Sequence, residues 1–179
     1  MRKLITIILC MCVATVGFSS LKVIYVPNSS VYSNPTPVEQ FMDRIADIET
    51  PGGGYHTVNK YGMMGRYQFS SQTIQAVGLR VTRQQFLRNK ELQDTAMVRL
   101  MEQNEEELSP YIQRYNGRTV KGVRINRASI LAGAHFAGAN GVKAFLTNNS
   151  QTGTIDGFGT SLKKYMSYFS EFHLPPLRG

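Results

Sequence analysis

Cysteine is almost missing from this chain of 179 residues, and the two that are present, Cys10 and Cys12, lie in the first apolar segment. The rest of the chain therefore has no thiol to form a disulfide bond, to act as a nucleophile or to bind zinc. None of the three histidines stands at a spacing to Asp or Glu that is typical of a metal site. No Ser-His-Asp order with a nucleophile elbow is present either. We expect no metal and no cofactor.

Acidic residues are also few, since twelve Asp and Glu oppose twenty Lys and Arg and leave a formal charge of +8. This excess favours a polyanionic partner such as nucleic acid, acidic lipid or a carboxylate-rich cell wall, without choosing among them. The length fits one domain at about 100–200 residues per domain. An apolar content of 42% is enough for a core.

The N-terminal apolar run is too short for an ordinary membrane span. It follows Arg2 and Lys3 and covers the fifteen uncharged residues 4–18, whereas a span needs about 20 residues. A basic start, a short apolar run and two following serines are typical of a secretory signal peptide. We predict a signal peptide over 1–19 and export to the periplasm, the cell envelope or the exterior. An uncleaved anchor is the alternative, and export together with scattered basic residues disfavours nucleic acid.

A linker and one domain follow the signal. Residues 20–35 are rich in Pro, Asn and Ser, which favour turns and extended backbone. The sequence from Thr36 to Glu39 is a capping box with proline at the first helical position, so we expect the domain to begin there. We predict the domain over 36–172 and a C-terminal tail over 173–179.

Apolar spacing in the domain predicts a mainly α fold. We expect a first helix that ends just after Glu49, a long helix from Asn89 to Asn116 that runs through Pro110 or kinks there, and a break at Gly138. Shorter helices are predicted over 71–77, after a second capping box at Thr82, over 128–137, after Asn140 and over 161–169. Alternation around a glycine over 119–125 predicts a small β-hairpin.

Glu49 is the main candidate for catalysis. On a helical wheel it lies about 20° from Met42 and about 40° from Ile45, so a carboxylate ends the apolar face of a helix. A carboxyl group placed there suits general acid catalysis. The alternative is that the helix frays before Glu49 and leaves the side chain in solvent. The loop beyond it, with Tyr55 and several glycines and amides, fits a sugar-binding cleft or an ordinary surface loop.

Three motifs in this order resemble those of the soluble lytic transglycosylases and goose-type lysozymes. Glu49 and Thr50 resemble the family's Glu-Ser, and Gly-Arg-Tyr-Gln at 65–68, with its Gln nineteen residues after Glu49, resembles Gly-x-Met-Gln. The third motif, at 134–142, resembles Ala-Tyr-Asn-Ala-Gly-x-Gly-x-Val. The similar region runs from about residue 38 to residue 146.

The resemblance implies a lysozyme-like helical fold and an enzyme that cleaves peptidoglycan. Glu49 would be its single catalytic acid and base, at the β-1,4 bond between N-acetylmuramic acid and N-acetylglucosamine. The expected substrate-binding residues are Thr50, Tyr55, Gly65, Tyr67, Gln68, His135 and Asn140. His135 and Phe136 stand where the family has Tyr and Asn; His can replace the hydroxyl as a donor, whereas Phe cannot replace the amide. His135 can equally be a core histidine bonded to a backbone carbonyl.

Glu49 has no evident partner carboxylate, although most glycoside hydrolases use two. Asp43 and Asp47 fall about 120° and 160° from it around the helix. Asp156 and Glu171 could approach only through tertiary folding. A lytic transglycosylase needs no second carboxylate, because the 6-hydroxyl of the substrate attacks and leaves a 1,6-anhydro product.

We therefore predict a monomeric lytic transglycosylase that acts on peptidoglycan glycan strands. A lysozyme-type hydrolase is the first alternative. A catalytically inactive wall-binding or assembly protein of the same fold is the second, since a fold does not guarantee an activity. Wall remodelling, a secretion or conjugation assembly in the cell envelope, and phage lysis all remain open as the biological setting.

Overall fold

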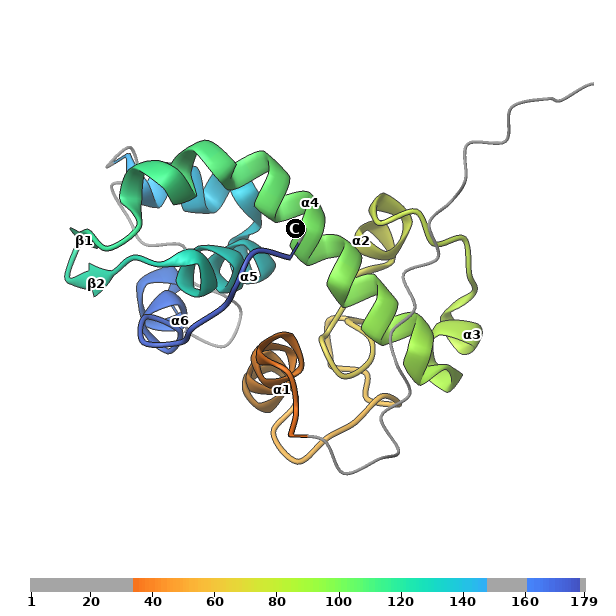
Figure 1. Ribbon diagram of the computed structural model, residues 1–179. Helices are drawn as coiled ribbons and strands as arrows, with labels where there is room; N and C mark the ends of the chain where they lie inside the picture. The colour runs from red at the N-terminus through yellow and green to blue at the C-terminus, as the bar shows by residue number, and fades with distance from the viewer. Residues whose placement is uncertain (1–33, 148–160, 178–179) are drawn as a thin grey trace, which may run out of the picture. The chain divides into compact units, whose positions relative to one another are not determined.

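The computed structural model describes residues 34–147 and 161–177, so the predicted signal peptide, almost all of the predicted linker and Asp156 lie outside the described residues. In chain order the elements are α1 (Pro37–Glu49), α2 (Ser71–Ala76), α3 (Arg83–Arg88), α4 (Lys90–Tyr115), β1 (Thr119–Val120), β2 (Val123–Arg124), α5 (Arg127–Leu146) and α6 (Leu162–Ser167). The two strands pair antiparallel. The described fold is thus mainly helical with one small hairpin, as predicted (Figure 1).

The helix starts follow the capping residues that the sequence predicts. Thr36 accepts a hydrogen bond from the backbone N–H of Glu39 at 3.2 Å, and the Glu39 carboxylate accepts one from the backbone N–H of Thr36 at 2.7 Å. Thr82 and Gln85 form the second capping box ahead of α3. Each box satisfies two backbone donors that a helix start leaves unpaired. Both predicted boxes are confirmed.

Helix α4 is the longest described element, and α3 and α5 pack along it. It begins after the Asn89 cap and ends at Tyr115. Of the two predicted alternatives, the structure shows the one in which the helix continues through Pro110. Figure 1 shows α3 beside the N-terminal part of α4 and α5 along its C-terminal part. This packing brings α5, which carries His135, back toward α1.

Helix α5 is interrupted at Gly138, where φ is +71° and ψ is 165°. Glycine alone adopts this backbone region readily. The predicted break is confirmed, and the chain returns to helical geometry up to Leu146. The third motif therefore lies on a broken helix, with His135 before the break and Asn140 after it.

The buried side chains form two cores. The first joins α1, the loop after it, α2, α3, the first part of α4 and one side of α5 and α6, and includes Phe41, Ile45, Phe69, Phe86, Met97, Leu131, Tyr165 and Phe169. The second surrounds the hairpin, the end of α4, α5 and α6, and includes Leu108, Ile125, Ile130, Phe145 and Met166. Phe136 packs against both. Across residues 34–147 and 161–177, no helix combines the length and the apolar character that crossing a membrane requires.

The segment predicted as a C-terminal tail packs onto the domain as far as the structure describes it. Leu174 is buried in the first core. The backbone N–H of Leu177 donates to Glu105 Oε2 at 3.0 Å, and Glu105 also pairs with Arg127 at the start of α5. These contacts tie the chain end to α4 and α5.

Candidate active site

Glu49 is the last residue of α1, and its carboxylate lies against α5 and α6. Tyr165 Oη donates a hydrogen bond to Glu49 Oε1 at 2.8 Å, and His135 Nε2 lies 3.8 Å from the same oxygen. The Glu49 side chain is 22% exposed, so it is mostly buried and still reachable from solvent. The helix does not fray before Glu49. The structure thus brings together two residues that are 116 positions apart in the sequence.

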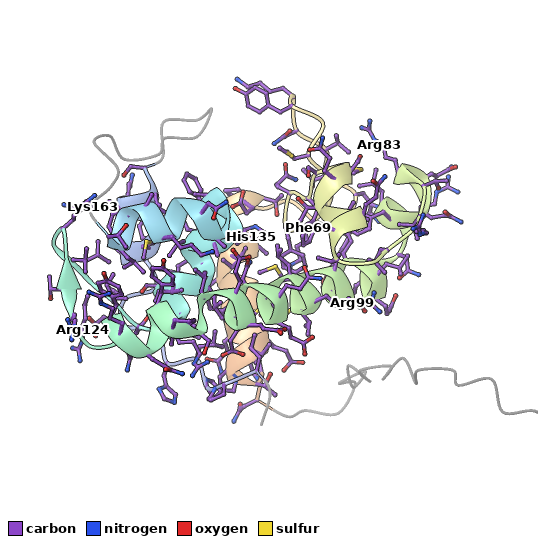
Figure 2. The ribbon with its side chains drawn as sticks, turned by 90° about the horizontal axis from the view of Figure 1, so that it is seen from above. Phe69, Arg83, Arg99, Arg124, His135 and Lys163 are labelled. Carbon is purple, nitrogen blue, oxygen red and sulfur yellow. The ribbon has the colours of Figure 1, made fainter. Side chains whose placement is uncertain are left out.

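Aromatic rings hold the two partners of Glu49 in place. The His135 ring meets Phe69 edge to face, with centroids 5.9 Å apart, and Figure 2 shows the two labelled side chains close together in the interior. Phe136 stacks on Tyr165 with centroids 4.8 Å apart. Phe136 cannot supply the amide that the family has at this position, but it fixes the ring whose hydroxyl binds Glu49.

His135 lies in a setting that favours the neutral imidazole. Its side chain is 7% exposed, and this burial is the main cause that lowers the pKa of His135 below its usual value. The Glu49 carboxylate and the Tyr67 backbone carbonyl act in the opposite direction and are weaker. Nδ1 is buried without a hydrogen-bond partner of ordinary geometry. Of the two predicted readings of His135, its burial fits a core histidine and its 3.8 Å distance to Glu49 fits a site residue.

The loop with Gly65 is fastened to α1 and α4. Thr50 Oγ1 lies 3.1 Å from the Ala46 carbonyl and 3.0 Å from the Arg66 carbonyl, both of which accept from it. Gln93 Oε1 accepts from the Arg66 backbone N–H at 2.9 Å. Gly65 has a φ of +76°, and a Cβ there would overlap the Gln93 side chain. Glycine is therefore required at position 65, because the positive φ disfavours other residues and the Gln93 side chain leaves no room for a Cβ.

Gln68, the predicted cleft residue, has an unusual backbone. Its φ is +53°, a left-handed conformation that few residues other than glycine adopt. Its Nε2 donates to the Gly65 carbonyl at 2.8 Å and closes the turn. Strained residues of this kind are found often at functional sites, where the surrounding structure holds them. The fastened loop provides that support.

Tyr55 and Tyr67 belong to one partly buried polar network. Asp94 Oδ1 accepts from both hydroxyls, at 2.9 Å from Tyr55 and 2.8 Å from Tyr67. Arg66 donates to Tyr55 Oη at 3.0 Å and to Asp43 at 2.7 Å. Burial, followed by the nearby Asp94 charge, raises the pKa of Tyr67 far above its usual value. The hydroxyls of Thr50, Tyr55 and Tyr67 are thus all used within the protein. The Tyr55 side chain is half-buried, and Asn140 is exposed.

The site also contains residues that sequence reasoning missed. Tyr165 carries no signal in the sequence, because it stands in the short helix α6 and only tertiary packing brings it to Glu49. Gln93 and Asp94 are polar residues of a long helix, where an exposed face is the ordinary expectation. Their role in holding the 65–68 loop follows from how α4 packs against it.

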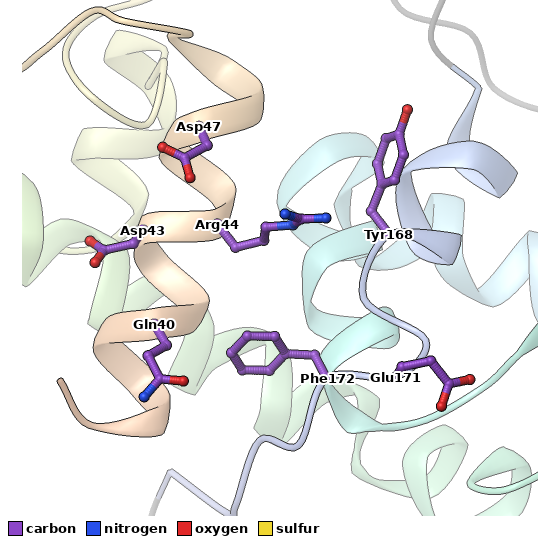
Figure 3. A pocket seen from close by; sticks show the side chains of 7 residues that line it. All are labelled: Gln40, Asp43, Arg44, Asp47, Tyr168, Glu171 and Phe172. Carbon is purple, nitrogen blue, oxygen red and sulfur yellow. The ribbon is translucent and has the colours of Figure 1, made fainter. Parts of the chain in front are cut away.

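Several other carboxylates in the described segments have partners away from Glu49. Asp43 pairs with Arg66, Asp94 with two tyrosines, and Glu107 with Lys143. A pocket of about 410 Å³ is lined by Gln40, Asp43, Arg44, Asp47, Tyr168, Glu171 and Phe172 (Figure 3). Gln40 and Glu49 are nine residues apart, about 180° around the helix, so this pocket lies on the side of α1 that faces away from Glu49. Asp47 and Glu171, which line this pocket, therefore do not lie beside Glu49.

In the part of the chain that the structure describes, no group of three or more His, Cys, Asp or Glu side chains could hold a metal ion. In the comparisons with known proteins, no family model, no curated protein and no solved structure matches this chain.

Proposed function

We propose that this protein is an exported lytic transglycosylase with a lysozyme-like fold, which cleaves the β-1,4 bond between N-acetylmuramic acid and N-acetylglucosamine in peptidoglycan. One observation carries the proposal. A single carboxyl group, Glu49, ends an otherwise apolar helix face, accepts a hydrogen bond from a buried hydroxyl and lies 3.8 Å from a buried imidazole. The order of the three motifs supports it, as does the positive charge, which is +8 for the whole chain and about +6 without Arg2 and Lys3 of the predicted signal peptide and suits a polyanionic wall.

In the proposed reaction Glu49 acts first as an acid and then as a base. Its carboxyl proton passes to the glycosidic oxygen, the C1–O4 bond breaks, and the N-acetylglucosamine side leaves with a 4-hydroxyl. The Glu49 carboxylate then accepts the proton of the muramyl 6-hydroxyl, whose oxygen forms a bond to C1. Tyr165 donates a hydrogen bond to the carboxylate and stabilises it between the two steps. The net change is a 1,6-anhydro end without added water.

The loop over 65–68 has the supporting role in this proposal. Its backbone is fixed by Thr50 and Gln93, so Gln68 is presented in one conformation. We assign Gln68 to hydrogen bonding with the sugar, and the half-buried Tyr55 to one wall of the cleft. A fixed loop lowers the entropy that substrate binding would otherwise cost.

A catalytically inactive wall-binding protein of the same fold is the second candidate, and specific observations favour it. Phe136 stands where the family has Asn, and the hydroxyls of Thr50 and Tyr67 are occupied within the protein. A lysozyme-type hydrolase is less well supported. It would need a carboxylate beside Glu49, and Asp43, Asp47, Asp94 and Glu171 point elsewhere or have other partners.

Mass analysis of the muropeptides released from purified sacculi separates the three candidates. A transglycosylase releases ends that are one water lighter than hydrolytic ends and that resist borohydride reduction. Reducible ends would make the protein a hydrolase. Binding to sacculi without any released fragment would make it a wall-binding protein.

A further inference from the structure

The end of the domain that the β-hairpin forms is rich in positive charge. From residue 108 to residue 155 the sequence has six Lys and Arg and no Asp or Glu. Helix α6 adds Lys163 and Lys164, again without an acidic residue. Arg127 and Lys143 pair with carboxylates of α4. The six cations that remain are all exposed, namely Arg114, Arg118, Lys121, Arg124, Lys163 and Lys164.

Four of these cations lie around one turn. Arg118 directly precedes β1 and Arg124 ends β2, so both flank the same strand pair. Lys121 is at the tip of the hairpin, where it and Gly122 have positive φ values of 49° and 79°. Lys163 of α6 reaches the same tip, because its Nζ is 3.6 Å from the place that a Cβ of residue 122 would take. We call these four cations the hairpin surface.

The charge of the hairpin surface is not compensated by nearby carboxylates. Within residues 34–147 and 161–177, no carboxylate pairs with Arg118, Arg124 or Lys163. Figure 2 shows Arg124 and Lys163 at the hairpin end of the domain, with Arg83 near the opposite end. That opposite end also has exposed arginines, but Glu91 follows them in the first turn of α4.

The hairpin surface is a projecting turn and not a pocket. Figure 1 shows the hairpin at the outer edge of the domain. The two pockets along α1 are lined by other residues. Small ligands bind in concave sites, so cations on a projecting turn fit an extended anionic surface better.

We propose that the hairpin surface docks this protein on a membrane that contains anionic phospholipids, with its cations on the phosphate groups. Guanidinium groups bind phosphate through two parallel hydrogen bonds, and basic clusters are attracted to anionic membranes. Tyr115 favours lipid over a wall polymer. Its carbonyl accepts from the Arg118 backbone N–H at 2.9 Å, and its half-buried ring is of the type that lies at membrane–water interfaces.

Docking through this surface also orients the candidate active site. Lys163 and Tyr165 are two residues apart on α6, about 200° around the helix, so they lie on opposite sides of it. Tyr165 is the residue that binds Glu49. Resting on the proposed function, the docked protein presents Glu49 away from the membrane and toward the wall.

The test measures how strongly the full chain binds to two kinds of vesicle, pure phosphatidylcholine and phosphatidylcholine with about 30% phosphatidylglycerol. The quantity compared is the ratio of the anionic to the neutral partition coefficient. The apolar run over 4–18 carries no charge, so it contributes equally to both coefficients and cancels in the ratio. We expect a ratio of about 10² or more at about 0.1 M salt, and a ratio near one at about 1 M salt, where screening is strong. A ratio near one at the lower salt overturns the proposal.

Two triple variants of equal net charge separate the hairpin surface from net charge alone. The first replaces three of its cations, Arg118→Gln, Arg124→Gln and Lys163→Gln. The control replaces three exposed arginines around α3, Arg80→Gln, Arg83→Gln and Arg88→Gln. We expect the ratio to fall about 10²-fold in the first variant, at about fivefold per cation, and less than about threefold in the control.

Equal ratios for the two triple variants overturn the proposal, because net charge would then explain the binding. Binding of the unchanged chain to sacculi without any preference for anionic vesicles also overturns it and assigns the charge to the wall. Should the first variant fail to fold, as judged by circular dichroism, Lys163→Gln and Arg83→Gln provide the same contrast, with an expected difference of about fivefold.

The vesicle measurement does not depend on activity, so the two proposals can fail separately. If sacculi stay intact while the ratio falls as expected in the first variant alone, the proposed function fails and the docking stands. If anhydro fragments are released while the ratio stays near one, the reverse holds.

Discussion

The hydroxyl of Tyr165 donates a hydrogen bond to Glu49 Oε1 at 2.8 Å. A charge-assisted bond to a partly buried carboxylate is stronger than a bond between neutral groups. It stabilises the form of Glu49 that follows proton transfer and orients the carboxyl group for both steps. The residue that sequence reasoning did not single out is therefore central to the proposed chemistry.

Tyr165→Phe tests this contact, because it removes only the hydroxyl and leaves the ring that stacks on Phe136. We expect activity on sacculi to fall about tenfold, with a loss of roughly 1 kcal/mol in the free energy of unfolding. The matched control is Tyr168→Phe, at an exposed position on the pocket that faces away from Glu49. Activity of Tyr165→Phe equal to that of the control would remove the hydroxyl from the mechanism.

Burial of His135 makes stability depend on pH. Because its pKa in the folded chain is below the ordinary value of about 6.5, the unfolded chain binds the proton more readily. The stability from the neutral ring is complete above about pH 6.5 and is lost as the pH falls, by up to about 1.4 kcal/mol per pH unit.

Urea unfolding at pH 7, 6 and 5 measures this dependence. The slope is expected to be smaller in His135→Gln, which cannot titrate, than in the unchanged chain. His173→Gln, at an exposed position, is the matched control. Parallel slopes for His135→Gln and the unchanged chain would contradict the burial of a neutral imidazole.

At the scale of elements, the loop over 65–68 depends on Gly65. The positive φ and the space occupied by Gln93 both exclude a side chain there. Gly65→Ala is therefore expected to lower the free energy of unfolding by about 2–4 kcal/mol, more than conformation alone would cost. Chemical denaturation gives the value.

Two other glycines separate the effect of a positive φ from the effect of the space that Gln93 occupies. Gly62 has a φ of +80° with open space around a Cβ, and Gly54 has open space without a positive φ. We expect the loss of stability to be largest for Gly65→Ala, intermediate for Gly62→Ala and near zero for Gly54→Ala. A Gly65→Ala variant no less stable than Gly62→Ala would show that the loop can move away from Gln93.

Elements whose ends are set by local chemistry could be predicted from the sequence. The capping boxes at Thr36 and Thr82 and the break at Gly138 are examples, because caps and left-handed glycines act over a few residues. Glu49 at the end of an apolar face was likewise predictable from helical periodicity. The contacts that a side chain makes after tertiary packing could not be predicted in the same way.

Tyr67 and Tyr165 show why tertiary contacts of single side chains could not be predicted from the sequence. Both are tyrosines in a chain that has nine, and nothing local distinguishes the one that binds Asp94 from the one that binds Glu49. The contacts depend on how α4 and α6 pack, over separations of 27 and 116 residues. The polar groups of Thr50 and Tyr67 could be assigned to the protein interior only once that packing was known.

At the scale of the whole molecule, the proposed site lies at the edge of the first core, on the side where Phe136 also contacts the second. Phe136 packs against both cores, and Glu49 receives contacts from α5 and α6 while it stands at the end of α1. Tyr165, Phe69 and the buried residues of α1 all belong to the first core, so this core supports Glu49 and the rings beside it. The claim that this position serves catalysis depends on Glu49.

The most direct test is the release of soluble fragments from sacculi by the unchanged chain, by Glu49→Gln and by a control, Glu107→Gln, whose side chain forms an exposed ion pair. Gln keeps the shape of Glu49 and removes its titrating proton. We predict that the rate falls about 10²-fold or more for Glu49→Gln, as for loss of a general acid, with a melting temperature unchanged or raised, and stays within about twofold for the control. A fully active Glu49→Gln variant would contradict the account.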